Sequence, residues 1–253
     1  MAYSYWHEVK VDSRDVDTLG FCKASALLGH LQEAATQAAE QGGFGRELMI
    51  RCYNGFWMLT RMWYRLERPL CWNEEIKIHT WHRGGKSAVS YRDYDIYVDE
   101  KLVGEGVAAW VMADRDTHKL IRLSQVHELG ETDGGNLCKN ITLSKLRQPE
   151  SLQRVENRIM RYSDTDINGH VNNTRYADFA CDALRMDAMG EGMFLSSMQI
   201  GYLAECHPGE VITMESGHQE NGCYVRGVDE SGKDRFETLL VFEKMCHESL
   251  AQR

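Results

Sequence analysis

The sequence has no long hydrophobic run, and this absence excludes one broad class of protein. No segment approaches the roughly 20 consecutive apolar residues that a membrane-spanning helix requires. The hydrophobic share of 43% and the charged share of 26% are close to the averages for globular proteins in water. We therefore expect a soluble, folded chain.

Paired cysteine motifs and a basic surface are also missing. The eight cysteines are scattered, without a C-x-x-C pair or the density of a disulfide-bonded scaffold, so we expect reduced thiols and a cytoplasmic location. The first residues show no basic segment followed by an apolar one, which predicts no targeting segment. A net charge of -9 argues against a general nucleic-acid surface, because phosphate binding needs clustered Lys and Arg.

An internal repeat favours two domains over one. The 253 residues can hold one large domain or two of roughly 100–150 residues each. The acidic segment 14–21 precedes apolar residues at helical spacing, and so does the acidic segment 163–170. The two segments align with Asp17 opposite Asp166, which are 149 positions apart.

Strand patterns follow each predicted helix in the same order. Residues 57–66 alternate and are rich in aromatic side chains, as a half-buried strand requires, and residues 198–203 are their counterpart. We expect hairpin turns at residues 83–86, which contain Gly-Gly, and at 220–223, which contain Asn-Gly. These turns are about 137 positions apart, so the first copy carries about a dozen extra residues after its helix.

Each copy is therefore predicted to be an α+β unit in which one helix packs against an antiparallel sheet. We expect an N-terminal domain over residues 1–116, a linker over 117–152 and a C-terminal domain over 153–253. The linker mixes glycine, charge and two weak apolar stretches, and a short functional element inside it stays an open alternative.

The second acidic loop concentrates side chains suited to chemistry. It reads D-x-N-x-H-V-N-N over residues 166–173, and we expect Asn172 or Asn173 to cap the helix that follows. The first amides of a helix lack internal partners and carry partial positive charge, so they stabilise a carbonyl oxygen that becomes an oxyanion. The carbonyl of a thioester is such a group.

The first copy is an internal control for this loop. Asp and Asn are common turn and capping residues, so each one alone has a structural explanation. The first loop has Leu19 in place of Asn168 and Phe21 in place of His170, although it also leads into a predicted helix. The fold therefore does not require Asn and His at these positions, and we expect catalysis in the second copy.

On these residues the chain resembles the acyl-ACP thioesterases, a family of tandem hot-dog folds whose second copy carries a D-x-N-x-H-V-N-N segment. Residues 55–61 in the first copy and the pair Glu205-Cys206 in the second support the resemblance, which covers nearly the whole chain. It implies a bacterial relative of the plant fatty acyl-ACP thioesterases. The implied fold is a tandem hot-dog, in which each antiparallel sheet wraps around a central helix.

The resemblance also implies an active site in the second copy and an N-terminal domain that lines a substrate tunnel without catalytic residues. The backbone amide of Val171 is the implied oxyanion donor. The implied catalytic side chains are those of Asp166, Asn168, His170, Glu205 and, as a disputed member, Cys206.

Two mechanisms compete for this site. In the first, Glu205 is the general base for a water that Asn168 and His170 position, while Asp166 orients its neighbours. In the second, His170 activates Cys206, which forms an acyl-enzyme. We favour the first, because an unperturbed thiol has a pKa of about 8.5 and an adjacent carboxylate raises that pKa further.

The implied reaction is the hydrolysis of fatty acyl-ACP to free fatty acid and holo-ACP, which ends fatty acid elongation. Its partner is the acyl carrier protein with its acyl-phosphopantetheine, and no cofactor is implied. We expect no metal, because His79, His82, His207 and His218 lack metal-ligand spacing with any Cys or Asp partner. Candidates for the lining of the acyl tunnel are Met58, Leu59, Met62 and Trp63.

Other readings stay open at this point. An acyl-CoA thioesterase would use the same site, and a non-catalytic acyl-binding module would use the same fold. A monomer and a homodimer are both compatible with two fused copies. An acidic carrier protein needs a local basic cluster on this acidic chain, and candidates are Arg46, Arg51, Arg61, Arg65 and Arg68.

Overall fold

The computed structural model describes residues 4–126, 141–188 and 192–245. The first half contains β1 (Ser4–Lys10), α1 (Ala24–Gln41), α2 (Arg46–Tyr53), β2 (Gly55–Leu66), β3 (Glu75–Lys86), β4 (Val89–Val98), β5 (Lys101–Asp114), β6 (Leu120–Ile121) and the 3-10 helix η1 (Leu123–Gln125). The second half contains β7 (Gln153–Ile159), η2 (Tyr162–Asp164), α3 (Arg175–Ala183), η3 (Met186–Ala188), β8 (Met193–Tyr202), β9 (Val211–Gln219), β10 (Gly222–Val228) and β11 (Asp234–Lys244).

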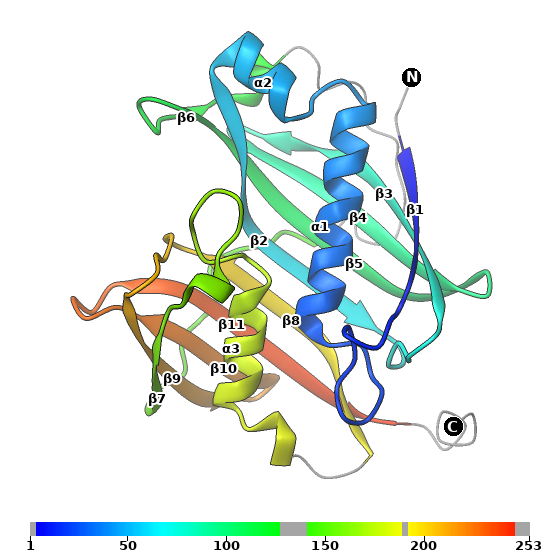
Figure 1. Ribbon diagram of the computed structural model, residues 1–253, viewed down its shortest axis with the longest axis vertical. Helices are drawn as coiled ribbons and strands as arrows, with labels where there is room; N and C mark the ends of the chain where they lie inside the picture. Colours follow the sequence, from blue (N-terminus) through cyan, green and yellow to red (C-terminus); the bar gives the residue numbers. More distant parts are fainter. Residues whose placement is uncertain (1–3, 127–140, 189–191, 246–253) are drawn as a thin grey trace.

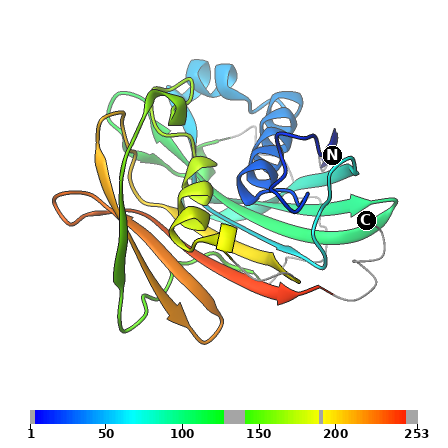
Figure 2. The ribbon, with the colours of Figure 1, turned by 60° about the horizontal axis from the view of Figure 1, so that its bottom comes forward.

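All of these strands form one antiparallel sheet in which the two halves repeat each other. The strand order is β1-β3-β4-β5-β2-β8-β11-β10-β9-β7, with β6 paired to β5. The order of the first half is therefore reversed in the second, and the halves join where β2 pairs with β8. Helix α1 lies across the first half of the sheet and α3 across the second, on the same side (Figures 1 and 2). The predicted tandem hot-dog fold is confirmed.

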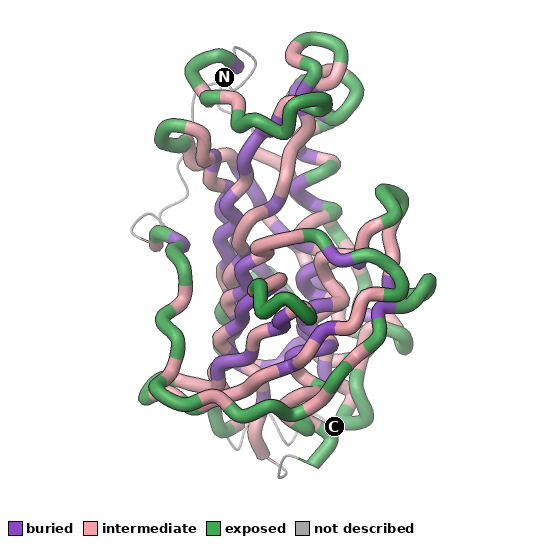
Figure 3. The backbone as a smooth tube through the Cα atoms, turned by 90° about the vertical axis from the view of Figure 1, so that its left-hand side faces the viewer, coloured by how far each residue is buried: buried purple, intermediate pink, exposed green. Residues whose placement is uncertain are grey.

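Helix α1 fills the first half because its apolar residues recur every three or four positions. The side chains of Leu27, Leu28 and Leu31 are at most 1% exposed, and alanines continue the stripe toward the C-terminal end of the helix. Burying each leucine contributes roughly 1.5–3 kcal/mol. Over the described residues, most buried positions lie in the middle of the molecule and most exposed positions lie at its turns and ends (Figure 3).

Helix α3 begins slightly later than the sequence predicts. Its N-cap is Thr174, so the expectation of Asn172 or Asn173 at this position is wrong. The reason is a turn in front of the helix, in which the side-chain oxygen of Asn172 accepts hydrogen bonds from the backbone N–H and the hydroxyl of Thr174, both at 2.9 Å. Asn172 therefore shapes the entry to the helix without capping it.

The two predicted hairpins differ in outcome. The turn between β9 and β10 lies at residues 220–221, inside the predicted segment. The first hairpin turn lies at residues 87–88, so the prediction of a turn at 83–86 is wrong. Gly84 has a φ of 102° and lies within β3 at a shift in its register with β4, so the glycine pair serves a β-bulge.

The tunnel candidates on β2 lie on two faces of the sheet. Leu59 and Met62 belong to the core beneath the helices. Trp63 packs on the other face, against Leu143 and its neighbours in the segment predicted as a linker. Because successive side chains of a strand alternate between faces, Trp63 cannot line a channel that Leu59 and Met62 border. Its assignment to the same tunnel is therefore wrong.

The segment between the halves is anchored to the sheet where it is described. Strand β6 and the 3-10 helix η1 lie inside the predicted linker, the carbonyl of Ile141 accepts a hydrogen bond from Arg83, and the amide of Leu146 donates to Glu237 at 2.9 Å. Residues 127–140 of this predicted linker lie outside the described residues. The domain boundaries stay a prediction. Over the described residues, no helix combines the length and apolar character needed to cross a membrane.

Candidate active site

The two acidic loops have the same backbone structure. In the second loop the amide of Asp166 donates to the carbonyl of His170 at 2.9 Å, and in the first the amide of Asp17 donates to the carbonyl of Phe21 at 2.9 Å. An isolated β-bridge closes each loop, between residues 16 and 22 and between residues 165 and 171. The loops therefore superpose with the offset of 149 positions that the sequence predicts.

The aspartate and a glycine hold this conformation in both copies. The carboxylate oxygen Oδ1 of Asp166 accepts a hydrogen bond at 2.8 Å from the amide two residues further on, and Asp17 does the same at 2.8 Å. Gly169 and Gly20 both have a φ of 77°, which is a conformation that favours glycine. Asp166 thus shapes its loop in the way that Asp17 shapes the first loop.

A second segment packs against each loop, and it also repeats. The amide of Val171 donates to the carbonyl of Cys206 at 2.9 Å, and the amide of Cys22 donates to the carbonyl of Leu70 at 2.7 Å. Position 70 of the first copy therefore corresponds to position 206 of the second, an offset of 136. We call these two hydrogen-bonded segments, the loop and its partner, the repeated frame.

The repeated frame shows which side chains differ between the copies while the backbone stays the same. The first copy is apolar or weakly polar at three positions where the second is titratable. The first copy has Phe21, Pro69 and Cys71, and the second has His170, Glu205 and His207 at the equivalent positions. Since the first copy folds with other residues, these three side chains are not needed to form the frame.

The frame brings two of the predicted catalytic side chains into contact. Nδ1 of His170 lies 3.3 Å from Oε1 of Glu205, and the side chains are 31% and 53% exposed, so the pair faces solvent. The ring of His207 meets that of His170 edge-on, with centroids 4.8 Å apart. His207 was not among the predicted site residues, although the difference from Cys71 in the aligned copies is a signal that marks it.

Arg235 is a second residue that the sequence did not single out. Its guanidinium donates a hydrogen bond to the backbone carbonyl of Glu205 and forms an ion pair with Asp229 at 3.0 Å. The same guanidinium lies 3.5 Å from the carboxylate of Glu210. Arg235 therefore holds the backbone that carries Glu205, and it comes from β11, which no motif in the sequence connects to the loop.

The remaining predicted residues are placed as follows. Asn168 is exposed at the tip of the loop, two residues after Asp166. The side chain of Cys206 is fully buried, and burial raises the pKa of its thiol. The amide of Val171 is already bound to the carbonyl of Cys206, so in this arrangement it is not available to an oxyanion. The predicted oxyanion role of Val171 therefore does not fit the described geometry.

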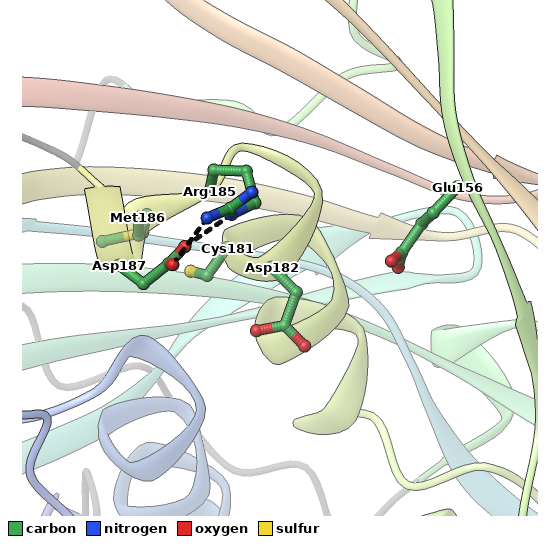
Figure 4. Close-up of a pocket in the computed structure, with 6 residues that line it drawn as sticks. All are labelled: Glu156, Cys181, Asp182, Arg185, Met186 and Asp187. Atoms are coloured by element: carbon green, nitrogen blue, oxygen red, sulfur yellow. Dashed lines mark hydrogen bonds and ion pairs between the residues drawn. The ribbon is translucent and has the colours of Figure 1, made fainter.

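A pocket of about 310 Å³ lies elsewhere, between the end of α3, η3 and β7 (Figure 4). Charged side chains dominate its lining, and Arg185 is paired within it to Asp187 at 2.9 Å. None of the predicted catalytic residues lines it. An acyl chain needs an apolar surface, so this pocket does not suit one.

Two family profiles match the chain in tandem. The acyl-ACP thioesterase N-terminal domain matches residues 2–128, and the acyl-ACP thioesterase C-terminal domain matches residues 148–240. A curated relative, the chloroplastic dodecanoyl-(acyl-carrier-protein) hydrolase of Cinnamomum camphora, is 27% identical over 218 residues, which cover 78% of this chain and 56% of that protein. The chain thus spans about half the length of the curated relatives it matches.

Solved structures share the fold over nearly the whole chain. An acyl-ACP thioesterase from Bacteroides thetaiotaomicron is similar with a TM-score of 0.79 at 22% identity, covering 95% of this chain and 98% of that one. The 12:0-ACP thioesterase from Umbellularia californica is similar with a TM-score of 0.78 at 18% identity, covering 96% and 98%. At these identities the likeness concerns the fold.

Proposed function

Because the chain belongs to the acyl-ACP thioesterase family, we propose that it hydrolyses fatty acyl-ACP thioesters to free fatty acid and holo-ACP. The observation that carries the proposal is the contact between His170 and Glu205 at 3.3 Å on the repeated frame. The same frame holds Phe21 and Pro69 in the first copy. A frame that forms without these polar groups supports a chemical role for them in the second copy.

In the proposed mechanism Glu205 is the general base. Its carboxylate takes a proton from a water that attacks the thioester carbonyl, and His170 orients the carboxylate through their contact. Asn168 is exposed at the tip of the same loop, and in this proposal its side-chain amide donates a hydrogen bond to the water or the thioester oxygen. Asp166 keeps the loop in shape, because its carboxylate accepts a hydrogen bond from the backbone N–H of Asn168.

The oxyanion needs a donor other than the amide of Val171. We propose that the side-chain amide of Asn168 takes this role, since one well-placed donor is worth roughly 3 kcal/mol. The leaving group is a thiol, which departs without strong acid assistance. Most of the barrier therefore lies in forming the tetrahedral oxyanion, and a donor on one short loop is sufficient for that purpose.

A covalent mechanism through Cys206 fits the site less well. The thiol is fully buried and burial raises its pKa, so the reactive thiolate is scarce near neutral pH. The thiol also hydrogen-bonds with the side chain of Tyr176 on α3. We propose that Cys206 packs the site and that a water, not this thiol, attacks the thioester.

The proposal also concerns the partner and the setting of the enzyme. The acyl carrier protein is the proposed substrate carrier. None of the described cysteines, at positions 22, 52, 71, 181, 206 and 223, forms a disulfide bond, which supports the proposal of a reducing compartment such as the cytoplasm. The number of copies in the assembly stays a prediction of one or two.

The test is release of free thiol from a panel of acyl-ACP and acyl-CoA thioesters of several chain lengths. We expect turnover of acyl-ACP, and a loss of about 10²- to 10⁴-fold in kcat for Glu205→Gln, which removes the base but keeps the size of the side chain. Glu220→Gln, an exposed position in the β9–β10 turn, is the matched control and should keep full activity.

The outcomes separate the rival functions. Faster turnover of acyl-CoA than of acyl-ACP at every chain length would replace the proposed substrate with acyl-CoA. A protein that binds acyl-ACP tightly but releases no thiol would be an acyl-binding module, and the hydrolase proposal would be wrong.

A further inference from the structure

A third potential ligand lies beside the proposed catalytic pair. One nitrogen of His170, one oxygen of Glu205 and one nitrogen of His207 all lie within 4.8 Å of one another. Within residues 4–126, 141–188 and 192–245, this is the only group of three His, Cys, Asp or Glu side chains that converges in this way. The repeated frame carries Phe21, Pro69 and Cys71 at the equivalent positions, so the convergence belongs to the second copy alone.

We propose that His170, Glu205 and His207 bind one divalent transition-metal ion of the zinc class, and that the bound ion inhibits thioester hydrolysis. The donor set consists of two imidazole nitrogens and one carboxylate oxygen. Zinc-class ions prefer this combination, often with a water at the fourth position. Magnesium and calcium prefer sites made of oxygen atoms, so these ions are poor candidates.

The distances support this geometry. A tetrahedral zinc ion with bonds of about 2.0–2.1 Å has ligand atoms about 3.3 Å apart. Nδ1 of His170 and Oε1 of Glu205 are already 3.3 Å apart. The nitrogen of His207 must move closer, by at most about 1.5 Å from the upper limit of 4.8 Å. Its side chain is exposed, so a small rotation is sterically free.

The repeated frame also fixes the backbone positions of the three proposed ligands. His170 ends the acidic loop, while Glu205 and His207 lie on the segment after β8, and the amide of Val171 ties the two together by its hydrogen bond to the carbonyl of Cys206. Arg235 holds the backbone of Glu205 by a hydrogen bond to its carbonyl. The ligands thus sit on a backbone that is already in place, and binding orders only side chains.

Inhibition rests on the proposed function. A metal ion bound to Glu205 takes the lone pair with which this carboxylate would accept a proton from water. It also takes the nitrogen through which His170 orients the carboxylate. Hydrolysis should therefore fall as the ion binds and recover when a chelator removes it.

The binding test uses the full chain, freed of metal by a chelator and titrated with ZnCl₂ by calorimetry and with CoCl₂ by visible absorption. We expect one ion per chain in the wild type. In His207→Gln the affinity should fall at least about 10-fold, because even partners that only orient a metal ligand are worth 10- to 100-fold. His218→Gln is the matched control, since His218 and Cys223 form a separate pair with Nδ1 and Sγ 3.4 Å apart.

The activity test is made on the same three proteins with acyl-ACP. Compared with its own rate without metal, His207→Gln should need at least about 10-fold more Zn²⁺ for half inhibition than the wild type needs. Absence of stoichiometric binding, equal affinity in His207→Gln, or a rate that rises with Zn²⁺ would each overturn the proposal. The calorimetric titration does not depend on turnover, so a failure of the metal site is distinguishable from a failure of the hydrolase proposal.

Discussion

Phe21 and His170 occupy equivalent places in two loops with the same hydrogen bonds, and this equivalence allows a test of one residue without harm to the fold. The variant His170→Phe gives the second loop the residue of the first. We expect the melting temperature to change by less than about 4 °C, the shift that 1 kcal/mol causes in a chain of this size. Activity should fall at least about 100-fold.

Two measurements check this prediction, namely a thermal melt and thiol release from acyl-ACP. The variant Asn168→Leu, which copies Leu19, should behave in the same way. Full activity in both variants would show that these side chains do not act on the substrate. A large loss of stability would show instead that the second loop depends on them, in contrast to the first.

Substitutions of the Cys206 thiol distinguish the attack by water from the covalent mechanism. In the proposed mechanism Cys206→Ala opens a small cavity and lowers kcat by less than about 10-fold, because the thiol does not react. Cys206→Ser should release fatty acid without forming a stable acyl-enzyme. Mass spectrometry of Cys206→Ser mixed with acyl-ACP checks this, and an added acyl group on residue 206 would favour the covalent mechanism.

The lowered pKa of the His82 imidazole predicts that the stability of the fold depends on pH. Burial first, and the charge of Arg92 second, lower the pKa of the His82 imidazole to about 4. The unfolded chain takes up this proton below a pH of about 6.5, and the folded chain only near 4. The free energy of unfolding therefore falls as the pH drops through this window, by on the order of 3 kcal/mol from this group.

The comparison with His82→Gln isolates this contribution. Burial raises the pKa of the Asp93 carboxyl to about 6. Protonation of this carboxyl therefore raises the free energy of unfolding as the pH falls from about 6 to about 4, and it does so in both proteins. Urea unfolding at several pH values should show a wild-type advantage over His82→Gln that shrinks from pH 7 to pH 4. Parallel curves would mean that His82 titrates normally in the folded state.

At the scale of elements, the sequence predicts helices and strands that follow from the spacing of apolar residues. It misses features that depend on pairing between segments far apart in the sequence. The apolar spacing in α1 and the alternation in β2 are local, so both elements could be predicted. The pair Gly84-Gly85 suits a turn and a bulge equally well, and only the pairing with β4 decides between them. Turn chemistry alone therefore placed the first hairpin three residues too early.

The candidate site follows the same rule. Residues 166–170 form one local motif and were predicted together. His207 lies 37 positions after His170, and only the hydrogen bond from Val171 to the carbonyl of Cys206 brings their segments together. The same bond removes the Val171 amide from the list of oxyanion donors. Both results depend on backbone pairing that no single-segment pattern contains.

Helix α2 has no counterpart among the described residues of the second copy, and it provides a test of carrier-protein binding. Arg46 and Arg51 are exposed on it, while Arg68 of the same predicted cluster is paired with Glu74 at 2.8 Å. If α2 contacts the acidic carrier, Arg46→Glu combined with Arg51→Glu should raise KM for acyl-ACP at low salt by at least about 10-fold. KM for acyl-CoA should stay unchanged, because the charges act on the protein partner.

Steady-state kinetics at two salt concentrations check this prediction. The wild-type KM for acyl-ACP should rise with salt and the double variant should respond less, since surface charges are screened within about 10 Å at 0.1 M salt. Lys10→Glu combined with Lys101→Glu, at two exposed positions outside the predicted basic cluster, is the control for a general change of charge. An equal effect of both changes on acyl-ACP would remove α2 as the docking element.

At the scale of the whole molecule, the continuous sheet predicts that the two halves unfold together. Strands β2 and β8 pair over five residue positions, and the buried hydroxyl of Ser197 donates across the seam to the carbonyl of Tyr64 at 2.7 Å. Helices α1 and α3 share one core beneath the sheet. Neither half can therefore lose its structure without exposing a sheet edge and core side chains of the other.

The tryptophans provide a convenient measurement of this coupling. All six lie in the first half, at positions 6, 57, 63, 72, 81 and 110, so their fluorescence reports on that half alone. Far-UV circular dichroism reports on the strands of both halves. We expect the two signals to change at the same urea concentration, as in a two-state transition.

Ser197→Ala should lower the stability by about 1 kcal/mol, because it leaves one buried acceptor without its hydroxyl donor. The urea midpoint should fall equally for both signals. Two separate midpoints would show that each half is a stable unit by itself and that the β2–β8 seam contributes little to the fold.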